Sequence, residues 1–267
     1  MWSNISGTHS SNLKRDNQSS INLLQMNRIT ILSLLLLALI PVSCIYYDGW
    51  GQGVTGNGNV TEEVRDISGF TGVHVSSGID VYLSQGDDFE VRVEADENLM
   101  DVIGTEVRGK MLVVGTDRYG IRRARSKIVR VTLPRLTGLK ISSAGDCEGQ
   151  TPFECDDLEL EISSAGDLTL EVDAEAIDVQ ISSSGDARLS GSAESLDVSM
   201  SSAGDLHAFD LVAGKVKVSV SSAGDARVHA TEEISMNASS AGNIYYMGDA
   251  RVIRSSSSSA GDIIKRN

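Results

Sequence analysis

Hydrophobic and polar residues alternate with a period of two along most of the C-terminal half of the chain. Between Leu158 and Leu170 every second residue is apolar or small, and most of the residues between them are charged or carry a hydroxyl group. The same alternation returns from Val216 to Val228. Because successive side chains of a strand point to opposite faces, the pattern predicts β-strands with one packed face and one face in water.

A five-residue turn motif, Ser-Ser-Ala-Gly-Asp, recurs through these alternating segments. Its copies and near copies place their glycines 18 to 21 residues apart, at Gly145, Gly166, Gly185, Gly204, Gly224, Gly242 and Gly261. A constant period near twenty residues is typical of stacked coils, in which equivalent residues lie about 4.8 Å apart. We therefore expect an all-β fold in which residues 137–267 form a single-stranded, right-handed parallel β-helix of about seven coils with 19–20 residues each.

Each turn motif is expected to form a sharp bend. Glycine adopts backbone angles that other residues avoid, so the motif glycine is expected to make this bend. The period-two pattern also places the second serine of each motif, from Ser143 to Ser259, on the packed face. A hydroxyl group in that position must bond to the backbone or to its neighbours.

Residues 61–136 are expected to form an antiparallel or mixed β segment in front of the coils. The alternating run Val73–Leu83 is expected to pair with Phe89–Val93 across the turn between them. The stretch that begins at Asp96 has helical spacing, with this aspartate placed as the N-cap of one short helix. Further strands are expected between this helix and residue 136.

The N-terminal residues are typical of export and anchoring sequences. Residues 1–25 are polar, and are either disordered or precede the true start at Met26. Residues 26–43 combine a basic start with an apolar run that is too short for a comfortable membrane span, as in a lipoprotein signal peptide. Cys44 is then expected to carry the lipid that anchors the chain to the outer membrane of a cell envelope, facing the periplasm or the surface; an uncleaved anchor and ordinary secretion stay open. Residues 44–60 are expected to be a flexible, glycine-rich tether.

The charge balance narrows the choice of partners. The formal net charge is −14, and it becomes −16 when residues 1–43 are removed. Such a chain repels phosphate backbones, so nucleic acid is not an expected partner. One basic cluster interrupts the acidic sequence, at Arg118, Arg122, Arg123, Arg125 and Lys127. It is either a solvated hairpin loop or a contact for an anion, such as a lipid headgroup, an acidic glycan or the acidic repeat of a neighbouring copy.

The turn motifs also place a column of acidic residues on the wetted face. If the coils stack in register, the column contains Asp146, Asp167, Asp186, Asp205, Asp225 and Asp262, with Asn243 among them. Neighbouring carboxylates at this spacing repel by about 1 kcal/mol in water. They either accept hydrogen bonds from turn amides or bind a row of Ca²⁺ ions, although the known calcium-binding β-helix repeat is missing. No other cofactor is expected.

Cys147 and Cys155 are the two thiols that remain after lipidation. They either close a small loop by a disulfide or stay as small buried residues. A zinc site is not expected, because the histidines of the mature chain are isolated in the sequence.

Three ordered motifs resemble one known family. They are Val75–Gly86 (VSSGIDVYLSQG), Val93–Leu99 (VEADENL) and Val131–Pro134 (VTLP), the last shortly before the first turn motif. Together they are similar to the auto-transporter adhesin, head GIN domain family over roughly residues 64–263. The resemblance implies a β-helical fold behind a lipoprotein signal in a bacterial cell envelope, and it implies no established activity.

We expect a non-catalytic envelope protein that presents a β-helical face to a glycan or protein partner, or that has a structural role. A long repetitive face suits an extended ligand. The alternatives are a polysaccharide lyase or hydrolase that uses Asp186, Arg188 and Asp205, and a scaffold stabilised by Ca²⁺. Catalysis needs one site unlike its surroundings, whereas these acids recur in every coil. The chain is therefore not expected to be an enzyme; its oligomeric state stays open.

Overall fold

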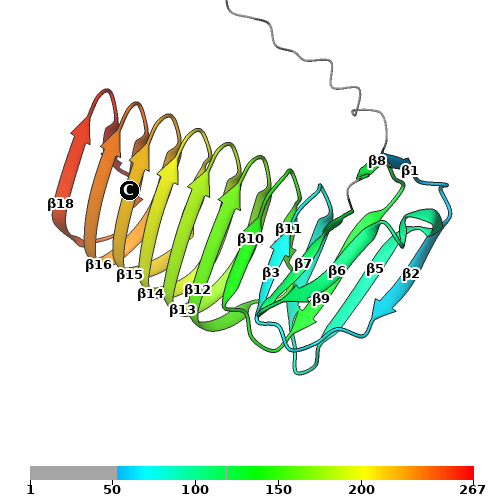
Figure 1. Cartoon of the computed structure of the whole chain (residues 1–267). Helices are drawn as coiled ribbons and strands as arrows, with labels where there is room; N and C mark the ends of the chain where they lie inside the picture. The colour runs from blue at the N-terminus through cyan, green and yellow to red at the C-terminus, as the bar shows by residue number, and fades with distance from the viewer. Residues whose placement is uncertain (1–52, 118) are drawn as a thin grey trace, which may run out of the picture. The chain divides into compact units, whose positions relative to one another are not determined.

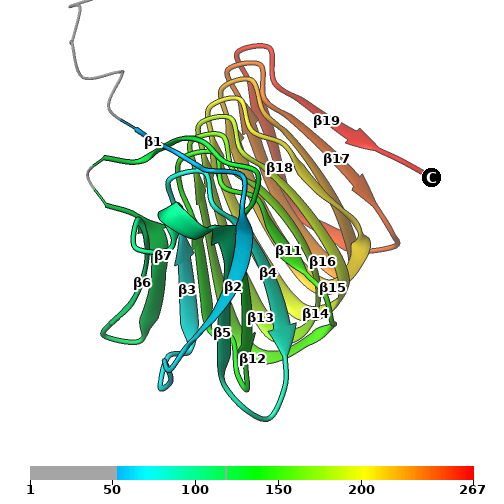
Figure 2. The same ribbon diagram turned by 90° about the vertical axis from the view of Figure 1, so that its right-hand side faces the viewer.

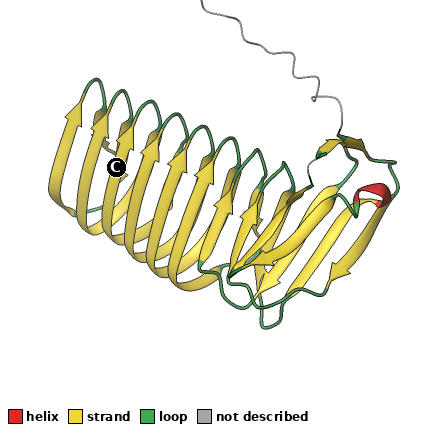
Figure 3. Cartoon of the chain, in the orientation of Figure 1, coloured by secondary structure: helices red, strands yellow, loops and turns green. Residues whose placement is uncertain are grey.

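The computed structural model describes residues 53–117 and 119–267, and these residues belong to one compact unit that extends from Gly51 to Asn267. The unit consists of stacked parallel coils, about seven turns in all, joined to a mixed β region (Figure 1). Within the described residues the only helix is a single 3-10 turn, η1 (Glu97–Leu99), drawn in red in Figure 3. The predicted all-β fold with a parallel β-helix is confirmed.

The strands form two layers, which Figure 2 shows nearly end-on. The first layer contains, in spatial order, β6 (Ile103–Arg108), β7 (Met111–Thr116), β3 (Gly72–Val75), β10 (Gly138–Ile141), the later parts of β12 (Phe153–Ser163), β13 (Asp167–Ser182), β14 (Asp186–Ser201), β15 (Leu206–Ser221) and β16 (Asp225–Ser239), and β18 (Arg251–Ser258). The second layer contains β2 (Val60–Arg65), β5 (Glu90–Asp96), β9 (Lys127–Leu133), β4 (Asp80–Gln85), β11 (Cys147–Gly149), the early parts of β13 to β16, β17 (Asn243–Met247) and β19 (Asp262–Lys265). The long strands β13 to β16 bend from the second layer into the first. Inward residues of both layers form one continuous hydrophobic core.

The coil stack extends further towards the N-terminus than the repeats predict. Strands β3 and β4 pair in parallel with β10 and β11, so Val73–Leu83 forms a coil of the stack. Its pairing with Phe89–Val93 was a wrong prediction, because β5 pairs with β2 and β9 instead. Strands β7 and β9 pair in parallel with β3 and β4 and form one more coil beyond it. Residue 137 therefore marks no break in the stack.

The bend of each turn motif is made by its second serine, joined in three motifs by the alanine that follows (Ala144, Ala241 and Ala260), which also has a positive φ. The second serine of every motif, from Ser143 to Ser259, is exposed and has φ between 52° and 97°. None of the motif glycines from Gly145 to Gly261 has a positive φ. The predicted roles were thus exchanged: the serine lies at the solvated turn, where its hydroxyl group is free to bond to water, and the glycine lies in the packed interior.

Close contact between coils explains the motif glycines. A Cβ atom on Gly166 would lie 2.9 Å from the carbonyl oxygen of Gly145 in the preceding coil, and one on Gly185 would lie 2.7 Å from the carbonyl oxygen of Gly166. A Cβ atom on Gly242 would lie 2.7 Å from the carbonyl oxygen of Ser222. Each Cβ atom would also meet the side chain of an isoleucine or valine, but rotating that side chain leaves the collision with the backbone oxygen in place.

Asp96 has a different role from the predicted helix cap. It precedes η1, but its side chain makes no hydrogen bond to that turn. The carboxylate is fully buried and accepts hydrogen bonds from the backbone N–H groups of Gly58, Arg125 and Ser126. Asp96 thereby joins the segment that begins at Gly53 to the loop between β7 and β9 that carries Arg122, Arg123 and Arg125, which we call the basic loop. The last residues of the predicted tether, 53–60, are consequently part of the folded unit, with β1 (Val54–Thr55) paired to β8 (Ile121–Arg123).

Cys147 and Cys155 are both free thiols. Cys147 pairs with Leu168 and Cys155 with Ala174, which are six positions apart on β13. The two cysteines therefore lie in different columns of the stack. The side chain of Cys147 is buried, and that of Cys155 is half-buried.

The two thiols are expected to react very differently with iodoacetamide. Burial raises the pKa of the Cys147 thiol far above its usual value and raises the pKa of Cys155 to about 11. Because the thiolate is the reactive form, labelling of Cys155 should accelerate about tenfold per pH unit between pH 7 and 10. Peptide mass spectrometry of the native protein should find Cys155 labelled and Cys147 unlabelled. Equal labelling of both would contradict the burial of Cys147.

Candidate binding site

The outer face of the second layer carries two parallel rows of polar side chains. We call the first the aspartate row; the strand register places in it Asp80, Asp146, Asp167, Asp186, Asp205, Asp225, Asn243 and Asp262. Two positions later on each strand lies the arginine row, which contains Arg92, Arg130, Tyr82, Glu148, Thr169, Arg188, His207, Arg227 and Tyr245. The two rows follow the whole length of the stack.

Carboxylates of the aspartate row accept hydrogen bonds from the next coil. The backbone N–H of Asp205 donates to Asp186 Oδ1 at 3.1 Å, and the N–H of Asp225 donates to Asp205 Oδ1 at 3.0 Å. Asn243 Nδ2 donates to Asp225 Oδ1 at 2.9 Å. Each of these hydrogen bonds links one coil to the next through an aspartate Oδ1 atom.

Asp146 in the aspartate row has a carboxylate on either side, Asp80 and Asp167. Partial burial, followed by the charges of Asp80 and Asp167, raises the pKa of the Asp146 carboxyl. Lys127 relieves part of this charge, because its Nζ lies 3.3 Å from Asp80 Oδ1. Among residues 53–117 and 119–267 no group of three or more histidine, cysteine or acidic side chains has the arrangement of a metal site.

The N-terminal end of the arginine row opens into a surface hollow of about 670 Å³. We call it the cap hollow. Its lining comes from strands β4, β5, β9 and β11 and from the residue that follows β11, and it includes Tyr82, Ser84, Glu90, Arg92, Arg130, Thr132, Glu148 and Gln150. The residues alternate with core residues along each strand, which is why they all face outwards.

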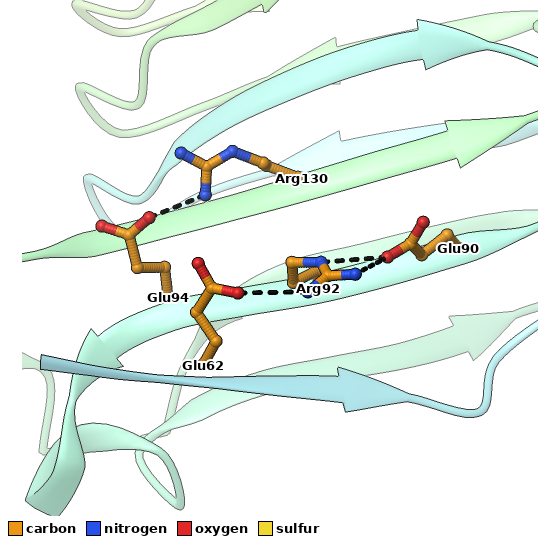
Figure 4. Close-up of polar contacts among 5 residues, drawn as sticks. All are labelled: Glu62, Glu90, Arg92, Glu94 and Arg130. Atoms are coloured by element: carbon orange, nitrogen blue, oxygen red, sulfur yellow. Dashed lines mark hydrogen bonds and ion pairs between the residues drawn. The ribbon is translucent and has the colours of Figure 1, made fainter.

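Two arginines on neighbouring strands, Arg92 and Arg130, form ion pairs with glutamates in and beside the cap hollow (Figure 4). Arg92 lies directly opposite Arg130 in the antiparallel pair β5–β9. The Nε of Arg92 donates to Glu90 Oε1 at 2.9 Å, and its Nη1 donates to Glu62 Oε2 at 3.1 Å. Arg130 Nη1 donates to Glu94 Oε2 at 2.7 Å. Each guanidinium is therefore fixed by carboxylates in spite of the like charge beside it.

These contacts set the protonation states of the cap hollow. Hydrogen bonds from Arg130 and then from Ser126 lower the pKa of the Glu94 carboxyl. Hydrogen bonds to Glu90 and then to Glu62 raise the pKa of the Arg92 guanidinium. Both shifts favour the charged forms of Arg92 and Glu94.

An aromatic ring completes the cap hollow. The guanidinium carbon of Arg130 lies 5.8 Å from the centre of the Tyr82 ring, within the range of a cation–π contact. The ring neighbours the uncharged hydrogen-bonding groups of Ser84, Thr132 and Gln150. The arrangement offers fixed donors, fixed acceptors and a planar ring in one place, which is the chemistry that binds polyhydroxylated molecules.

Residues 69–250 match the family described as "putative auto-transporter adhesin, head GIN domain". The chain belongs to this family. Solved structures share the fold. A putative adhesin from Bacteroides fragilis aligns with a TM-score of 0.74 at 21% identity, over 80% of this chain and 100% of that one. A putative adhesin from Parabacteroides merdae aligns with a TM-score of 0.67 at 21% identity, over 81% of this chain and 100% of that one. A putative lipid binding protein from Parabacteroides distasonis aligns with a TM-score of 0.66, at 21% identity over 80% and 99% of the two chains. No curated protein matches the sequence.

Some predicted site residues of the chain lie outside the described residues. Cys44 and Arg118 are among them. Arg122, Arg123 and Arg125 are exposed on the loop between β7 and β9, whereas Lys127 turns to the carbonyl oxygen of Gly78 and to Asp80. In the described part of the chain, no helix has the length and apolar character needed to cross a membrane.

The sequence also failed to single out the cap hollow of the head GIN domain. Arg92 and Arg130 stand at ordinary outward positions of two alternating strands, and only the antiparallel pairing brings them together. Asp80 was missed from the aspartate row because its motif, Ser-Ser-Gly-Ile-Asp, departs from the repeat. A tolerant search for Ser-Ser followed by Asp three positions later would have found it.

Asp186, Arg188 and Asp205, the residues of the enzymatic alternative, lie on adjacent coils of the two rows. Asp186 and Asp205 both accept the N–H of the following coil. Arg188 pairs in register with Thr169 and His207. The geometry around these acids repeats from one coil to the next, so nothing in it distinguishes one pair of carboxylates.

Proposed function

We propose that this chain is a non-catalytic, lipid-anchored protein of the bacterial cell envelope that binds a glycan through the cap hollow. The observation that carries the proposal is the fixed pair Arg92 and Arg130, held by glutamates beside the ring of Tyr82. Charge-assisted hydrogen bonds to prearranged groups cost little ordering entropy when a ligand binds. The membership of an adhesin family supports a binding role.

The balance of charge selects the class of glycan. Both arginines of the cap hollow are already paired with carboxylates, so the site offers no excess positive charge to an anionic ligand. Glu90 and Glu148 add acceptor oxygens to the lining. Neutral sugars, whose hydroxyl groups both donate and accept, fit this set better than uronic acids do.

We propose a non-catalytic role because carboxylates of the aspartate row make the same structural hydrogen bond in successive coils. Each of Asp186 and Asp205 accepts a backbone N–H from the next coil, and an acid engaged in this way is a structural turn residue. A glycosidase needs two carboxyl groups in distinct environments at one position.

A glycan array tests the cap hollow directly. Replacing Arg130 by Ala removes the partner of Glu94 and the cation above Tyr82, and should weaken binding of any retained neutral glycan by about tenfold or more. The matched control is Arg108→Ala. Arg108 also forms an ion pair with a glutamate, in its case Glu106 on the same strand, but it lies on the other layer, away from the cap hollow. Equal effects of both substitutions, or binding to acidic glycans alone, would contradict the proposed site.

Anchoring is tested separately at Cys44. The apolar run before this residue supports its lipidation. Mass spectrometry of the N-terminal peptide from membranes should find an acylated Cys44, and a Cys44→Ser variant should lack the acyl groups. An unmodified Cys44 in membrane-bound protein would contradict lipidation without affecting the glycan site.

A further inference from the structure

The chain enters its folded unit beside the basic loop. Strand β1 pairs with β8, the backbone N–H of Val54 donates to the carbonyl oxygen of Gly120, and the N–H of Gly56 donates to that of Arg123. A Cβ atom on Gly53 would lie 2.8 Å from the backbone nitrogen of Arg122. Residues 53–56, where the chain enters the folded unit, are therefore hydrogen-bonded to the basic loop and packed against it.

The buried carboxylate of Asp96 fixes this piece to the coil stack. It accepts hydrogen bonds from Gly58 on the entering segment and from Arg125 and Ser126 on the loop. Ile121 and Ala124 of the loop pack against the hydrophobic core. The loop thus holds a fixed orientation in the folded unit, and its arginines project from a defined place.

Three arginines of the loop have no carboxylate partner among the described residues. Arg122, Arg123 and Arg125 are exposed and form no ion pair there, whereas ten other cations of this part of the chain pair with glutamate or aspartate. In a chain of net charge −14 such a group is conspicuous. Arginine donors of this kind bind phosphate groups well.

We propose that Arg122, Arg123 and Arg125 contact the anionic phospholipid headgroups of the membrane in which the chain is anchored. The proposal rests on the proposed anchor at Cys44. Only residues 45–52 separate this cysteine from Gly53, and even a fully extended segment of that length spans about 30 Å at most. The basic loop is therefore kept close to the membrane surface, where each arginine favours an anionic surface by roughly fivefold.

The same contact orients the coil stack. The loop is the turn of the coil formed by β7 and β9, and the aspartate row begins at Asp80 in the adjoining coil. Anionic headgroups attract the loop and repel the row of carboxylates. The repeated coils of the stack consequently point away from the membrane.

Vesicle binding tests the contact with or without lipidation. Residues 51–267 form a compact unit with its own core, so a chain of residues 45–267 with an N-terminal hexahistidine tag can be attached to vesicles that contain a nickel-chelating lipid. The ratio of its apparent Kd on phosphatidylcholine vesicles to that on phosphatidylglycerol-containing vesicles is measured at low salt. The parent chain should bind the anionic vesicles at least about tenfold more tightly, and 0.5 M salt should abolish the preference.

Two triple variants with the same change of charge decide the result. Arg122→Gln, Arg123→Gln and Arg125→Gln together should reverse the preference, because the remaining acidic chain is repelled. The control combines Lys215→Gln, Arg254→Gln and Lys265→Gln, which are exposed and distant in the stack, and it should keep the parent's ratio. Equal ratios for the two variants, or no preference in the parent, would overturn the proposal. Since the tag replaces Cys44, such a failure would say nothing against lipidation or the glycan site.

Discussion

Replacing Gly204 by Ala is expected to lower the free energy of unfolding by about 3 kcal/mol. The added methyl group would lie 2.7 Å from Ile181 Cγ2 and closer still to the carbonyl oxygen of Gly185 in the preceding coil. Relief requires the two coils to separate, which breaks the hydrogen bonds between them. Urea unfolding followed by circular dichroism measures the loss.

Gly104→Ala is the matched control for this substitution. Gly104 lies in β6 and, like Gly204, has no positive φ, but a Cβ atom there would meet only the carbonyl oxygen of Gly115, at 3.9 Å. Its stability should stay unchanged or rise by up to about 1 kcal/mol, because alanine loses less backbone entropy than glycine. If both variants lost the same stability, close contact between coils would not explain the motif glycines.

Asp96→Asn is expected to release the basic loop from the coil stack. The carboxylate accepts three backbone N–H groups, whereas an asparagine amide has one oxygen and turns its NH₂ group towards a donor. Hydrogen exchange of the Arg125 and Ser126 amides should accelerate by at least about tenfold. Asp88→Asn, at an exposed loop position, is the control and should leave these amides protected.

The hold of Asp96 is expected to depend on pH in the acid range. Burial alone would raise its pKa, but the N–H groups of Arg125, Ser126 and Gly58 outweigh burial, and the pKa lies below its usual value of 3.8. A lowered pKa in the folded state contributes stability above the usual value and loses it as pH falls through the folded value. Protection of the two amides should be constant above pH 5 and should fall below pH 4. Protection that fell already at pH 6 would contradict this role.

Much of the fold followed from the sequence because the coils repeat. Alternation from Leu158 to Leu170 determines which residues face inwards, and the constant spacing of the glycines determines that coils lie in register. The role of the turn motif did not follow. Serine and glycine stand two residues apart, and the period-two pattern does not reveal that β13 ends at the first serine of its motif, Ser182, and that β14 begins only after the glycine, at Asp186.

The N-terminal part was less predictable because its contacts are not local. Strand β5 is close in sequence to β4 yet pairs with β2 and β9, since the parallel positions beside β4 are taken by β9 and β11. The cap hollow depends on this pairing: Arg92 and Arg130 are 38 positions apart in the sequence and lie directly opposite in the sheet. Asp96 was assigned to the helix it precedes, although its hydrogen-bond donors lie at residues 58, 125 and 126.

The most direct test of the account is to incubate the chain with a panel of neutral and acidic polysaccharides and to record retention and new chain ends in the same samples. We predict that a neutral member is retained, that Arg130→Ala loses this retention while Arg108→Ala keeps it, and that no new chain ends form. New ends with any member would contradict the non-catalytic assignment and direct attention to the carboxylates of the aspartate row. Retention that is undiminished in the Arg130 variant would contradict the cap hollow as the binding site.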